Sequence, residues 1–388
     1  MLNFKIIGCG AAGNKAAIEL LKSGYDDEQI ILINSTAKDI DPKYKDKLII
    51  FGKGLGGCGK ERSLGKQMIM DDLKNGKIVP EGMTSSRDRG VILVGSTEGG
   101  SGSSIIPILA KYFKEVVGVN VICVLFFGFQ DDTRGLQNSI ELAQELSNEY
   151  TIVGISNAKF LKSCNNNRFR AELKANEHFV KLVNILSGAT IKQGSQVIDD
   201  ADLFKIVFTP GYLMADSIPI SNITTIDDFN NVVLDSIKDS KYIDPPEEPG
   251  VKREGLIFNV EEEIDAIDYG GLIFNDIFGN PYEKFTHLST DATGYSLDYI
   301  LSGMKLPIEE LTNLYNKYIE NSKKVDKKKD NFFEMLSDMR GNSEDLQFNM
   351  LNSTDGKKPS SSKSDFFKNV LGEDNTKTNS KKSTEDFY

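Results

Sequence analysis

Short, continuously apolar segments alternate with segments of helical periodicity in the first part of the chain. The apolar runs are Phe4–Ile7, Ile30–Ile33, Val91–Gly95, Val119–Phe127 and Thr151–Ile155. Apolar residues at helical spacing occur between them, at Asn14–Lys22, Ser103–Tyr112 and Gln137–Leu146. Continuous apolar strands separated by helices are typical of a parallel sheet that is covered on both faces. The pattern therefore predicts an α/β domain.

The pattern changes in the second part of the chain. A long helix is predicted from Arg168 to Ile191, and Gly194 is expected to end it. A further helix is predicted near Ile226–Lys238, followed by a proline-rich linker at Pro245–Pro249. Three strand-like runs and a helix come next, at Gly255–Val260, Gly271–Ile277, Phe285–Ser289 and Pro307–Lys317. This arrangement predicts a smaller α+β domain.

The last part of the chain has a different composition. Helical pattern resumes through Asn331–Met339, and beyond Gly341 the chain is rich in Ser, Asn, Lys and Asp, so we expect disorder there. Two apolar pieces interrupt this tail, Ser364–Leu371 and Glu385–Tyr388. They are either docking peptides or isolated hydrophobic residues in a disordered tail.

Composition limits the class of protein. The chain has 388 residues, of which 39% are hydrophobic, and its mean hydropathy is −0.30. Its apolar runs are too short or too interrupted to cross a bilayer, so no membrane insertion is expected. Met1 leads directly into a strand-like run, which leaves no room for a signal peptide. Four cysteines without paired spacing favour a reducing cytoplasm over a disulfide or zinc framework.

The net charge of −11 is unevenly distributed. Residues 1–322 hold 33 basic against 45 acidic side chains, whereas Gly356–Lys382 holds 7 lysines against 3 acids. An acidic body repels nucleic acid. Any contact with DNA is therefore expected through the basic tail or through a partner protein.

Three glycine-rich loops lie at the ends of predicted strands. Gly8–Gly13 follows a strand and opens a helix, as in dinucleotide-binding proteins, where backbone N–H groups approach phosphate. A dehydrogenase would need an acidic residue at the tip of the second strand, but Ile33–Thr36 has none. The other two loops are Gly52–Gly59 and Gly95–Ser104. Together they predict a triphosphate held from several sides, and no GxxxxGK[ST] motif of P-loop NTPases is present.

These loops resemble those of the tubulin/FtsZ superfamily. The segment 95–104 resembles the signature GGGTGSG, with Glu98 in place of the first signature glycine and Ser101 in place of threonine. GCGAAGN at 8–14, NSTAKD at 34–39 and GLGGCGK at 54–60 match the other phosphate-side loops in order. The resemblance covers about residues 1–320 and implies a tubulin-like fold. Its expected parts are a Rossmann-like GTP-binding domain (1–167), a central helix (168–193), a smaller α+β activation domain (194–306), a C-terminal helical region (307–340) and a disordered tail (341–388).

The resemblance also implies a site for GTP or GDP with Mg²⁺. The residues expected at the phosphates are Gly10, Ala11, Ala12, Asn14, Asn34, Gly56, Gly57, Gly99, Gly100, Ser101, Gly102 and Ser103. Asp132 and Arg134 are expected in the sugar–phosphate loop. Asn157 is expected at the ribose and guanine and Asn176 at the guanine, because an amide can satisfy donor and acceptor edges alike. No protein metal ligand is assigned, and Glu98 either turns away or helps to hold Mg²⁺.

An acidic segment follows the central helix. Val197–Asp202 resembles the NxDxxD/E loop of the superfamily, with Asp199 and Asp202 at the acidic positions and valine in place of asparagine. In the family these acids polarise the water that attacks the γ-phosphate of the neighbouring subunit. A helix from Asn176 to about Gln193 is roughly 25 Å long, so acids at its far end cannot serve the nucleotide at its start. The alternative is a solvated acidic turn.

The resemblance implies a GTPase that forms head-to-tail filaments and hydrolyses GTP between subunits. The divergent signature, the C-terminal helix and the basic tail resemble plasmid and phage TubZ-type tubulins, which implies DNA segregation through a DNA-binding adaptor on the tail. An FtsZ-like division filament, a GTP-binding structural filament with little turnover and, third, a dehydrogenase are the alternatives. His178 and His287 are the only histidines, and for His178 a structural role is expected rather than that of a general base.

Overall fold

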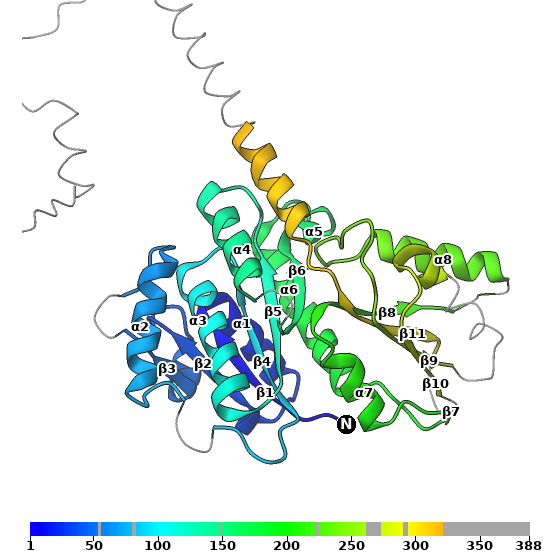
Figure 1. The fold of residues 1–388 in the computed structure, drawn as a ribbon, viewed down its shortest axis with the longest axis horizontal. Helices are drawn as coiled ribbons and strands as arrows, with labels where there is room; N and C mark the ends of the chain where they lie inside the picture. Colours follow the sequence, from blue (N-terminus) through cyan, green and yellow to red (C-terminus); the bar gives the residue numbers. More distant parts are fainter. Residues whose placement is uncertain are drawn as a thin grey trace, which may run out of the picture. The chain divides into compact units, whose positions relative to one another are not determined.

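The computed structural model describes residues 1–320, except 53–55, 80–82, 147–148, 222, 224, 261–272, 290–293 and the side chains of 195–196. All described residues belong to one compact unit, Met1–Lys327 (Figure 1). Of the predicted C-terminal helical region, residues 308–320 are described and are helical. Its continuation to 340 and the tail 341–388, with Ser364–Leu371 and Glu385–Tyr388, lie outside them.

Six parallel strands form the first half of the sheet, in the order β3-β2-β1-β4-β5-β6. Their bounds are Phe4–Cys9 (β1), Ile30–Asn34 (β2), Leu48–Ile50 (β3), Gly90–Ser96 (β4), Val121–Phe127 (β5) and Thr151–Ser156 (β6). Every residue of β1, β5 and β6 is buried, which explains their continuous apolar sequences. The prediction of a parallel sheet in this region is confirmed.

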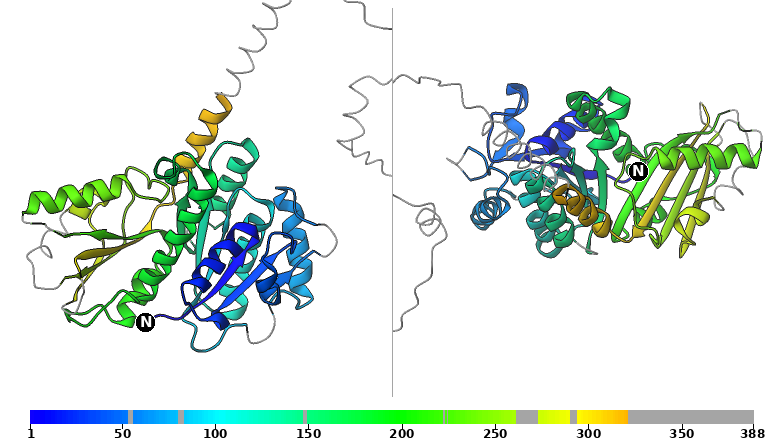
Figure 2. Two further views of the ribbon diagram at one scale, coloured as in Figure 1. Left: turned by 180° about the vertical axis from the view of Figure 1, so that it is seen from behind. Right: turned by 90° about the horizontal axis from the view of Figure 1, so that it is seen from above.

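Helices cover this half of the sheet in two groups. The main helices are Gly10–Lys22 (α1), Arg62–Lys74 (α2), Gly100–Tyr112 (α3), Thr133–Leu146 (α4) and Arg168–Ser187 (α6). Short helical turns lie at Asp27–Gln29 (η1), Pro42–Lys47 (η2), Phe113–Val117 (η3), Asn157–Phe160 (α5) and Lys162–Cys164 (η5). α1 packs against α6, whereas α3 packs against α2 and α4. Figure 2 shows these groups on opposite sides of the sheet.

α6 is the central helix, and Figure 2 shows it running between the two halves of the unit. It begins after Asn167, whose side chain accepts a hydrogen bond from the Arg170 N–H at 3.0 Å. It ends at Ser187, because Gly188 adopts a left-handed conformation with φ 74° and the next amides bond back to the helix. The predicted end near Ile191 is thus wrong by one turn, and Gly194 begins a strand instead of ending the helix.

The second half of the sheet is mixed, in the order β8-β11-β9-β10-β7. Its strands are Gly194–Gln196 (β7), Gly211–Pro219 (β8), Arg253–Asn259 (β9), Glu283–Ser289 (β10) and Ser296–Met304 (β11), with helices Asp200–Val207 (α7) and Ile226–Lys238 (α8). β9 and β10 are parallel, and the other pairs are antiparallel. The strand predicted at Gly271–Ile277 is wrong, since 273–278 is helical with Phe274 and Phe278 one turn apart and buried.

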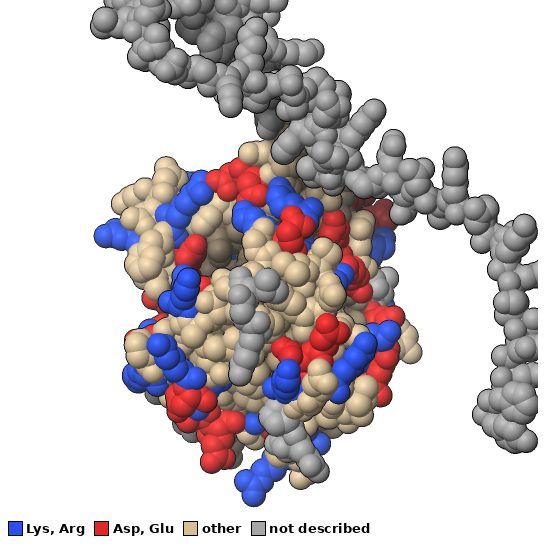
Figure 3. All heavy atoms as spheres, turned by 90° about the vertical axis from the view of Figure 1, so that its left-hand side faces the viewer, with Lys and Arg blue, Asp and Glu red and all other residues tan. Residues whose placement is uncertain are grey.

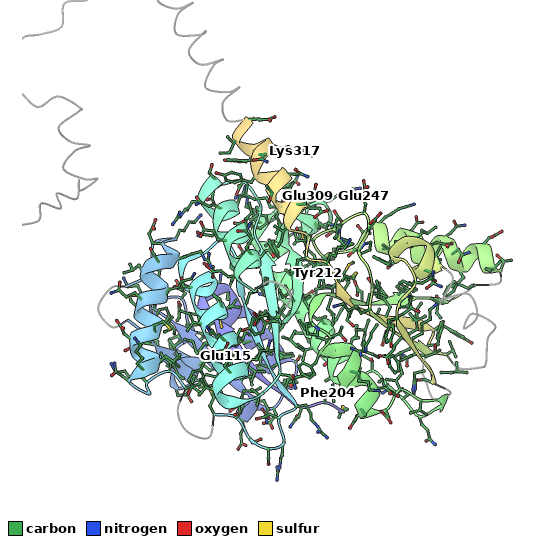
Figure 4. All side chains as sticks on the ribbon, in the orientation of Figure 1. Glu115, Phe204, Tyr212, Glu247, Glu309 and Lys317 are labelled. Atoms are coloured by element: carbon green, nitrogen blue, oxygen red, sulfur yellow. The ribbon has the colours of Figure 1, made fainter. Side chains whose placement is uncertain are left out.

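The two halves of the sheet meet at a narrow junction. β6 and β8 share only two parallel register pairs, Thr151 with Gly211 and Ile152 with Tyr212. The buried hydroxyl of Tyr212 (Figure 4) strengthens this junction by donating to the Ile243 carbonyl oxygen at 2.7 Å, with the Gly154 carbonyl oxygen of β6 at 3.3 Å as the weaker acceptor of the same proton. Most ladder hydrogen bonds therefore lie within each half, and few cross between them.

Two general features concern the surface and the cysteines. The face shown in Figure 3 has basic and acidic side chains interspersed, without a broad basic patch of the kind that binds nucleic acid. No helix among the described residues combines the length and the apolar character needed to cross a bilayer. All four cysteines, Cys9, Cys58, Cys123 and Cys164, are buried free thiols.

Candidate functional site

Two adjoining cavities open at the carboxyl ends of the parallel strands. The first, about 370 Å³, lies between the loops that follow β1, β2 and β4. The second, about 230 Å³, extends towards α5 and α6. They share Ala11, Ala12 and Ser96 as walls, so one elongated ligand could occupy both. Ligands of open parallel sheets bind at this edge.

The first cavity faces the N-termini of two helices. α1 and α3 begin at Gly10 and Gly100, and neither is capped by a side chain. Their unpaired N–H groups and helix dipoles favour an anionic ligand. Gly10 has φ 74°, and a Cβ there would lie 2.8 Å from the backbone nitrogen of Gly102. The two glycine loops therefore touch through their backbones, and a side chain at Gly10 would separate them.

Hydroxyl groups add to the walls of the first cavity. The Ser35 and Ser101 hydroxyl oxygens are 2.9 Å apart, and Thr36 and Asp39 lie beside them. No lysine or arginine lines this cavity within the described residues, which omit 53–55 of the neighbouring glycine loop. Among those residues, a phosphate would be held by N–H and hydroxyl groups.

Most residues predicted at the phosphates line the first cavity. These are Gly10, Ala11, Ala12, Asn34, Gly56, Gly57, Gly99, Gly100, Ser101 and Gly102. Asn14 and Ser103 line neither cavity. The Ser103 hydroxyl donates to the Gly99 carbonyl oxygen, which braces the first turn of α3. Asn14 is fully buried, and within the described part of the chain neither polar atom of its amide has a hydrogen-bond partner.

The second cavity brings the two predicted asparagines together. Asn157 begins α5 directly after β6, Asn176 lies on α6, and both line this cavity. The Asn157 side-chain oxygen has no hydrogen-bond partner among the residues that the structure describes. Phe126 and Phe129 supply an aromatic surface beside the two amides. A planar heterocyclic base could stack on such a surface while its edge pairs with the amides.

Glu98 also lines the second cavity and is absent from the walls of the first. Its carboxylate fills the space beside Gly128, where a Cβ would lie 2.1 Å from a carboxylate oxygen. It accepts a hydrogen bond from the Gln130 N–H at 3.3 Å. Burial raises the pKa of Glu98 above its ordinary value. The departure from the signature therefore places a carboxyl group at the end of the site near the asparagines.

Asp132 and Arg134 lie on the walls of neither cavity. Asp132 accepts hydrogen bonds from the Lys60 ammonium at 2.7 Å and the Gly135 N–H at 2.6 Å. Burial opposes ionisation of Asp132, yet these bonds hold its pKa below the ordinary value. Arg134 pairs with Glu61 at 2.9 Å. Both residues thus tie Lys60 and Glu61, directly after the loop Gly52–Gly59, to the start of α4.

The acidic segment lies beyond the far end of α6. Asp199 caps α7, since one carboxylate oxygen accepts from the N–H groups of Ala201 and Asp202 at 2.8 Å each. Asp200 pairs with the Met1 amine at 2.8 Å. Asp202 is half-buried in the first turn, and Val197, at the position of the family's asparagine, is 61% exposed. None of these residues lines either cavity.

The length of α6 separates these acids from the cavities. From Asn176 to the end of the helix at Ser187 the rise is about 17 Å. The acids follow only after a further loop and β7. Asp199 and Asp202 are therefore on a different part of the chain's surface from the two cavities.

Sequence analysis missed several wall residues. In the first cavity they are Cys9, Ser35, Thr36, Asp39 and Ser96, and in the second Lys15, Phe126, Gly128, Phe129 and Glu172. Those of the first cavity all lie in the loops 8–14, 34–39 and 95–104 that the sequence indicated, although they were not predicted individually. Lys15 and Glu172 lie on two helices far apart in sequence, and their charged groups are 3.9 Å apart. No local signal indicates that pair.

His178 is structural, as expected, but it is buried and does not lie on the surface of α6. Its ring packs against Phe160 and Tyr242 with centroid distances of 5.9 and 5.1 Å. Burial lowers its pKa. It lines neither cavity, so the geometry gives no support to a role as general base.

Comparison with known proteins finds similarity to one family in the first part of the chain. Residues 3–165 match the family described as "Tubulin/FtsZ family, GTPase domain". The chain is also similar to cell division protein FtsZ 1 of Methanocaldococcus jannaschii, at 24% identity over 214 residues. That match covers 54% of this chain and 57% of the relative, so it spans little more than half of the relative's length.

Solved structures extend the likeness to the second half of the unit. A GTPγS-form protofilament of Bacillus thuringiensis serovar israelensis TubZ aligns with a TM-score of 0.68 and 16% identity, covering 84% of this chain and 94% of that one. GTPγS-bound CetZ2 from Haloferax volcanii, also a protofilament, aligns with a TM-score of 0.66 and 18% identity, covering 83% and 100%. Residues 3–165 are thus similar to the tubulin/FtsZ GTPase-domain family, and the chain has a tubulin-like fold of the kind seen in TubZ and CetZ.

Proposed function

We propose that this protein binds GTP and hydrolyses it between successive subunits of a head-to-tail filament. The carrying observation is the separation of two sets of residues. The cavities lie at one end of α6, and the acids Asp199 and Asp202 lie beyond the other end. If both sets serve one nucleotide, they must come from different subunits. A contact of this heterologous kind generates an open polymer.

In this proposal the nucleotide spans both cavities. Its phosphates bind the unpaired N–H groups of α1 and α3, and its guanine lies beside Asn157 and Asn176. Mg²⁺ in nucleotide sites is held by one or two protein oxygens together with phosphates and water. Asp39 and the hydroxyl groups of Ser35 and Ser101 are oxygen donors that fit this need. The ion would neutralise charge on the phosphates.

The acids of the next subunit would orient and polarise the attacking water. Two hydrogen bonds from the start of α7 fix one carboxylate oxygen of Asp199 and so orient the group. The other oxygen can still accept a hydrogen bond from water. Asp202 lies one turn further along α7. Such fixed groups act at the moment of reaction without reorganising.

Base selectivity tests the nucleotide assignment. Competition binding should show GTP preferred over ATP by about tenfold or more, because two amides at the second cavity can read the guanine edge. Equal affinities for the two nucleotides would contradict the guanine assignment. GDP should compete with GTP, since both carry the same base.

Turnover as a function of protein concentration tests the shared site. Phosphate release per subunit should rise sharply above a critical concentration, and electron microscopy should show filaments above the same concentration. A rate per subunit that stays constant on high dilution would contradict hydrolysis between subunits.

For the biological role we propose movement of plasmid or phage DNA, with a DNA-binding adaptor recruited by the basic segment Gly356–Lys382. The likeness to TubZ supports this role, whereas the match to an FtsZ supports cell division as the second candidate. Truncation after Gly341 should leave turnover and polymerisation intact and abolish recruitment of the cargo. A shortened or missing polymer would indicate instead that the tail docks on a neighbouring subunit.

A further inference from the structure

The loop between α6 and α7 leads directly into the two acids, and β10 holds it. Within this loop β7 pairs with β10 in antiparallel fashion, Gly194 opposite Ser289 and Gln196 opposite Leu288. The approach is close, because a Cβ at Gly194 would lie 2.0 Å from the Leu288 carbonyl oxygen. The backbone just before Asp199 is therefore fixed to the edge of the second half of the sheet.

His287 of β10 contacts both ends of this loop segment. Its ring is buried, with 1% exposed. Nδ1 accepts a hydrogen bond from the Ile198 N–H at 3.2 Å, one residue before Asp199. Nε2 lies 2.9 Å from the Lys192 carbonyl oxygen. One imidazole thus joins residues 192 and 198 across β7.

These partners determine the tautomer of His287. A carbonyl oxygen only accepts, so Nε2 carries the proton and Nδ1 is the acceptor, and the ring is neutral. The Ser289 hydroxyl lies 3.1 Å from Nε2 and donates onward to Asn259 at 3.0 Å. Asn259 in turn donates to the Asp298 carboxylate at 3.2 Å. Each donor in this series of hydrogen bonds has an acceptor, which fixes the orientation of the His287 ring.

We propose that His287 is a positioning residue, whose neutral ring holds the 192–198 segment so that Asp199 and Asp202 are presented to the nucleotide of the neighbouring subunit. This inference rests on the proposed function. Protonation of Nδ1 removes the acceptor of the Ile198 N–H and places two donors face to face. The loop then loses its attachment directly before the cap of α7, and the acids move from their places.

The charged groups around the ring come from three elements. The loop contributes Lys192, β11 contributes Asp298 through the neutral Asn259 of β9, and β10 itself carries Lys284 and Glu283 further along the strand. Burial lowers the pKa of His287, and the bond to the Lys192 carbonyl partly offsets this. The stabilisation that the neutral ring gives to the folded protein is therefore complete at pH values above about 6.5, the pKa of histidine in the unfolded chain. It is lost as the pH falls from there through the folded pKa.

Two isosteric variants separate the contacts. In His287→Asn the side-chain oxygen can replace Nδ1 as the acceptor for Ile198, without titrating. In His287→Gln the side-chain nitrogen can replace Nε2 as the donor to Lys192, but the Ile198 N–H loses its acceptor. We expect His287→Asn to keep turnover, and His287→Gln to lose about tenfold or more, with GTP affinity unchanged in both.

The pH profile of turnover adds a readout that a merely structural role would not move. On acidification through the lowered pKa of His287, which lies below the ordinary value of 6.5, wild-type turnover should fall more steeply than that of His287→Asn, because only the wild-type ring titrates. The γ-phosphate titrates alike in both proteins, so the difference isolates His287. Equal turnover of wild type and His287→Gln, or identical acid limbs for wild type and His287→Asn, would overturn the proposal.

A measurement on the unmodified chain keeps the proposal testable if the variants fold poorly. The chain has two histidines, so nitrogen NMR of the GDP-bound protein can resolve both rings. We expect an Nε2–H tautomer for His287 at neutral pH, and an Nδ1–H tautomer would refute the arrangement. Asp202→Ala serves as the reference: if it hydrolyses GTP at the wild-type rate, the proposed function fails, whereas the inference alone fails if only the His287 variants behave as wild type.

Discussion

At the scale of single residues, two carboxylates stand out because their surroundings differ. Glu98 is partly buried beside Gly128, where the pKa of its carboxyl group is raised. Asp199 is exposed and accepts two backbone N–H bonds at the start of α7. The bond from the Gln130 N–H compensates the first carboxylate only in part for its lost hydration, whereas the second is compensated by a helix terminus.

Glu98→Gln should stabilise the ligand-free protein at neutral pH. The pKa of Glu98 is higher in the folded than in the unfolded protein, so its ionised form destabilises the folded state. This destabilisation grows as the pH rises above the pKa of the unfolded protein. The variant's melting temperature should exceed that of the wild type at pH 7.5, and the difference should vanish near pH 4. Glu172→Gln, on another wall of the cavity, is the matched control. A lower melting temperature at pH 7.5 would mean that the bond from Gln130 outweighs the burial.

Variants at the two acids should separate capping from catalysis. Asp199→Asn retains an oxygen that can cap α7, so it should keep wild-type stability and lose most turnover. Asp199→Ala should lose turnover as well as about 1 kcal/mol of stability. Asp202→Ala should lose turnover alone, with GTP binding intact and longer-lived filaments. Phosphate release measures turnover, and thermal unfolding measures stability. Wild-type turnover in all three variants would mean that the segment is a solvated acidic turn without a catalytic role.

At the scale of elements, the junction of α6 with the following loop determines where the acids lie. Gly188 ends the helix in a left-handed conformation, and a Cβ there would lie 2.8 Å from a methyl carbon of Leu203 on α7. The helix end, the loop and α7 are thus in contact at one point. A change at this point should affect the acids without touching the nucleotide cavities.

Gly188→Ala should therefore lower both stability and turnover. The left-handed conformation costs an L-residue about 1–2 kcal/mol, and the contact with Leu203 adds to this. Gly24→Ala is the control, since Gly24 has φ 96° but open space around it. Thermal unfolding should show Gly188→Ala less stable than the control, with GTP affinity unchanged. Equal melting temperatures of the two variants would mean that α7 adjusts without cost.

The elements that sequence reasoning predicted share a local signal. Five of the six parallel strands were found because they are apolar throughout, and the glycine loops because each directly follows a strand, whereas the short β3 was not predicted. β8 and β11 carry polar residues such as Asp216, Asp298 and Ser302 within the strand, so their patterns were not recognised. Asp298 and Ser302 are buried among partners from other strands. Walls of the second cavity from separate helices, such as Lys15 and Glu172, likewise depend on tertiary contacts that no local pattern records.

At the scale of the whole molecule, the described unit carries two incomplete parts of one proposed site. Asp199 and Asp202 line neither of the two cavities. A single subunit should then hydrolyse GTP poorly. In a filament, each interface between two subunits should hydrolyse its own nucleotide whether or not the neighbouring interfaces are active. This independence can be tested by mixing.

Two inactive variants should restore activity together. Asp202→Ala keeps the cavities, whereas Ala12→Asp places a carboxylate on the wall that both cavities share and should repel the triphosphate. In a random equal mixture about a quarter of the head-to-tail contacts join an intact cavity to an intact loop. Phosphate release should recover to a corresponding fraction of the wild-type rate. No recovery, in mixtures that electron microscopy shows to copolymerise, would argue for a site within one chain.

The buried cysteines have a practical consequence for such mixing experiments. All four thiols are buried, which slows their reaction with maleimides. Burial also raises the pKa of Cys9 and Cys123 far above the ordinary value, so these two stay protonated. A single cysteine introduced on the surface, for example in place of the 86%-exposed Tyr282, can therefore carry a fluorophore while the native thiols remain. Two colours on two variants would then report subunit exchange by energy transfer. The same dye, added to unlabelled protein, would follow unfolding as the native thiols become accessible.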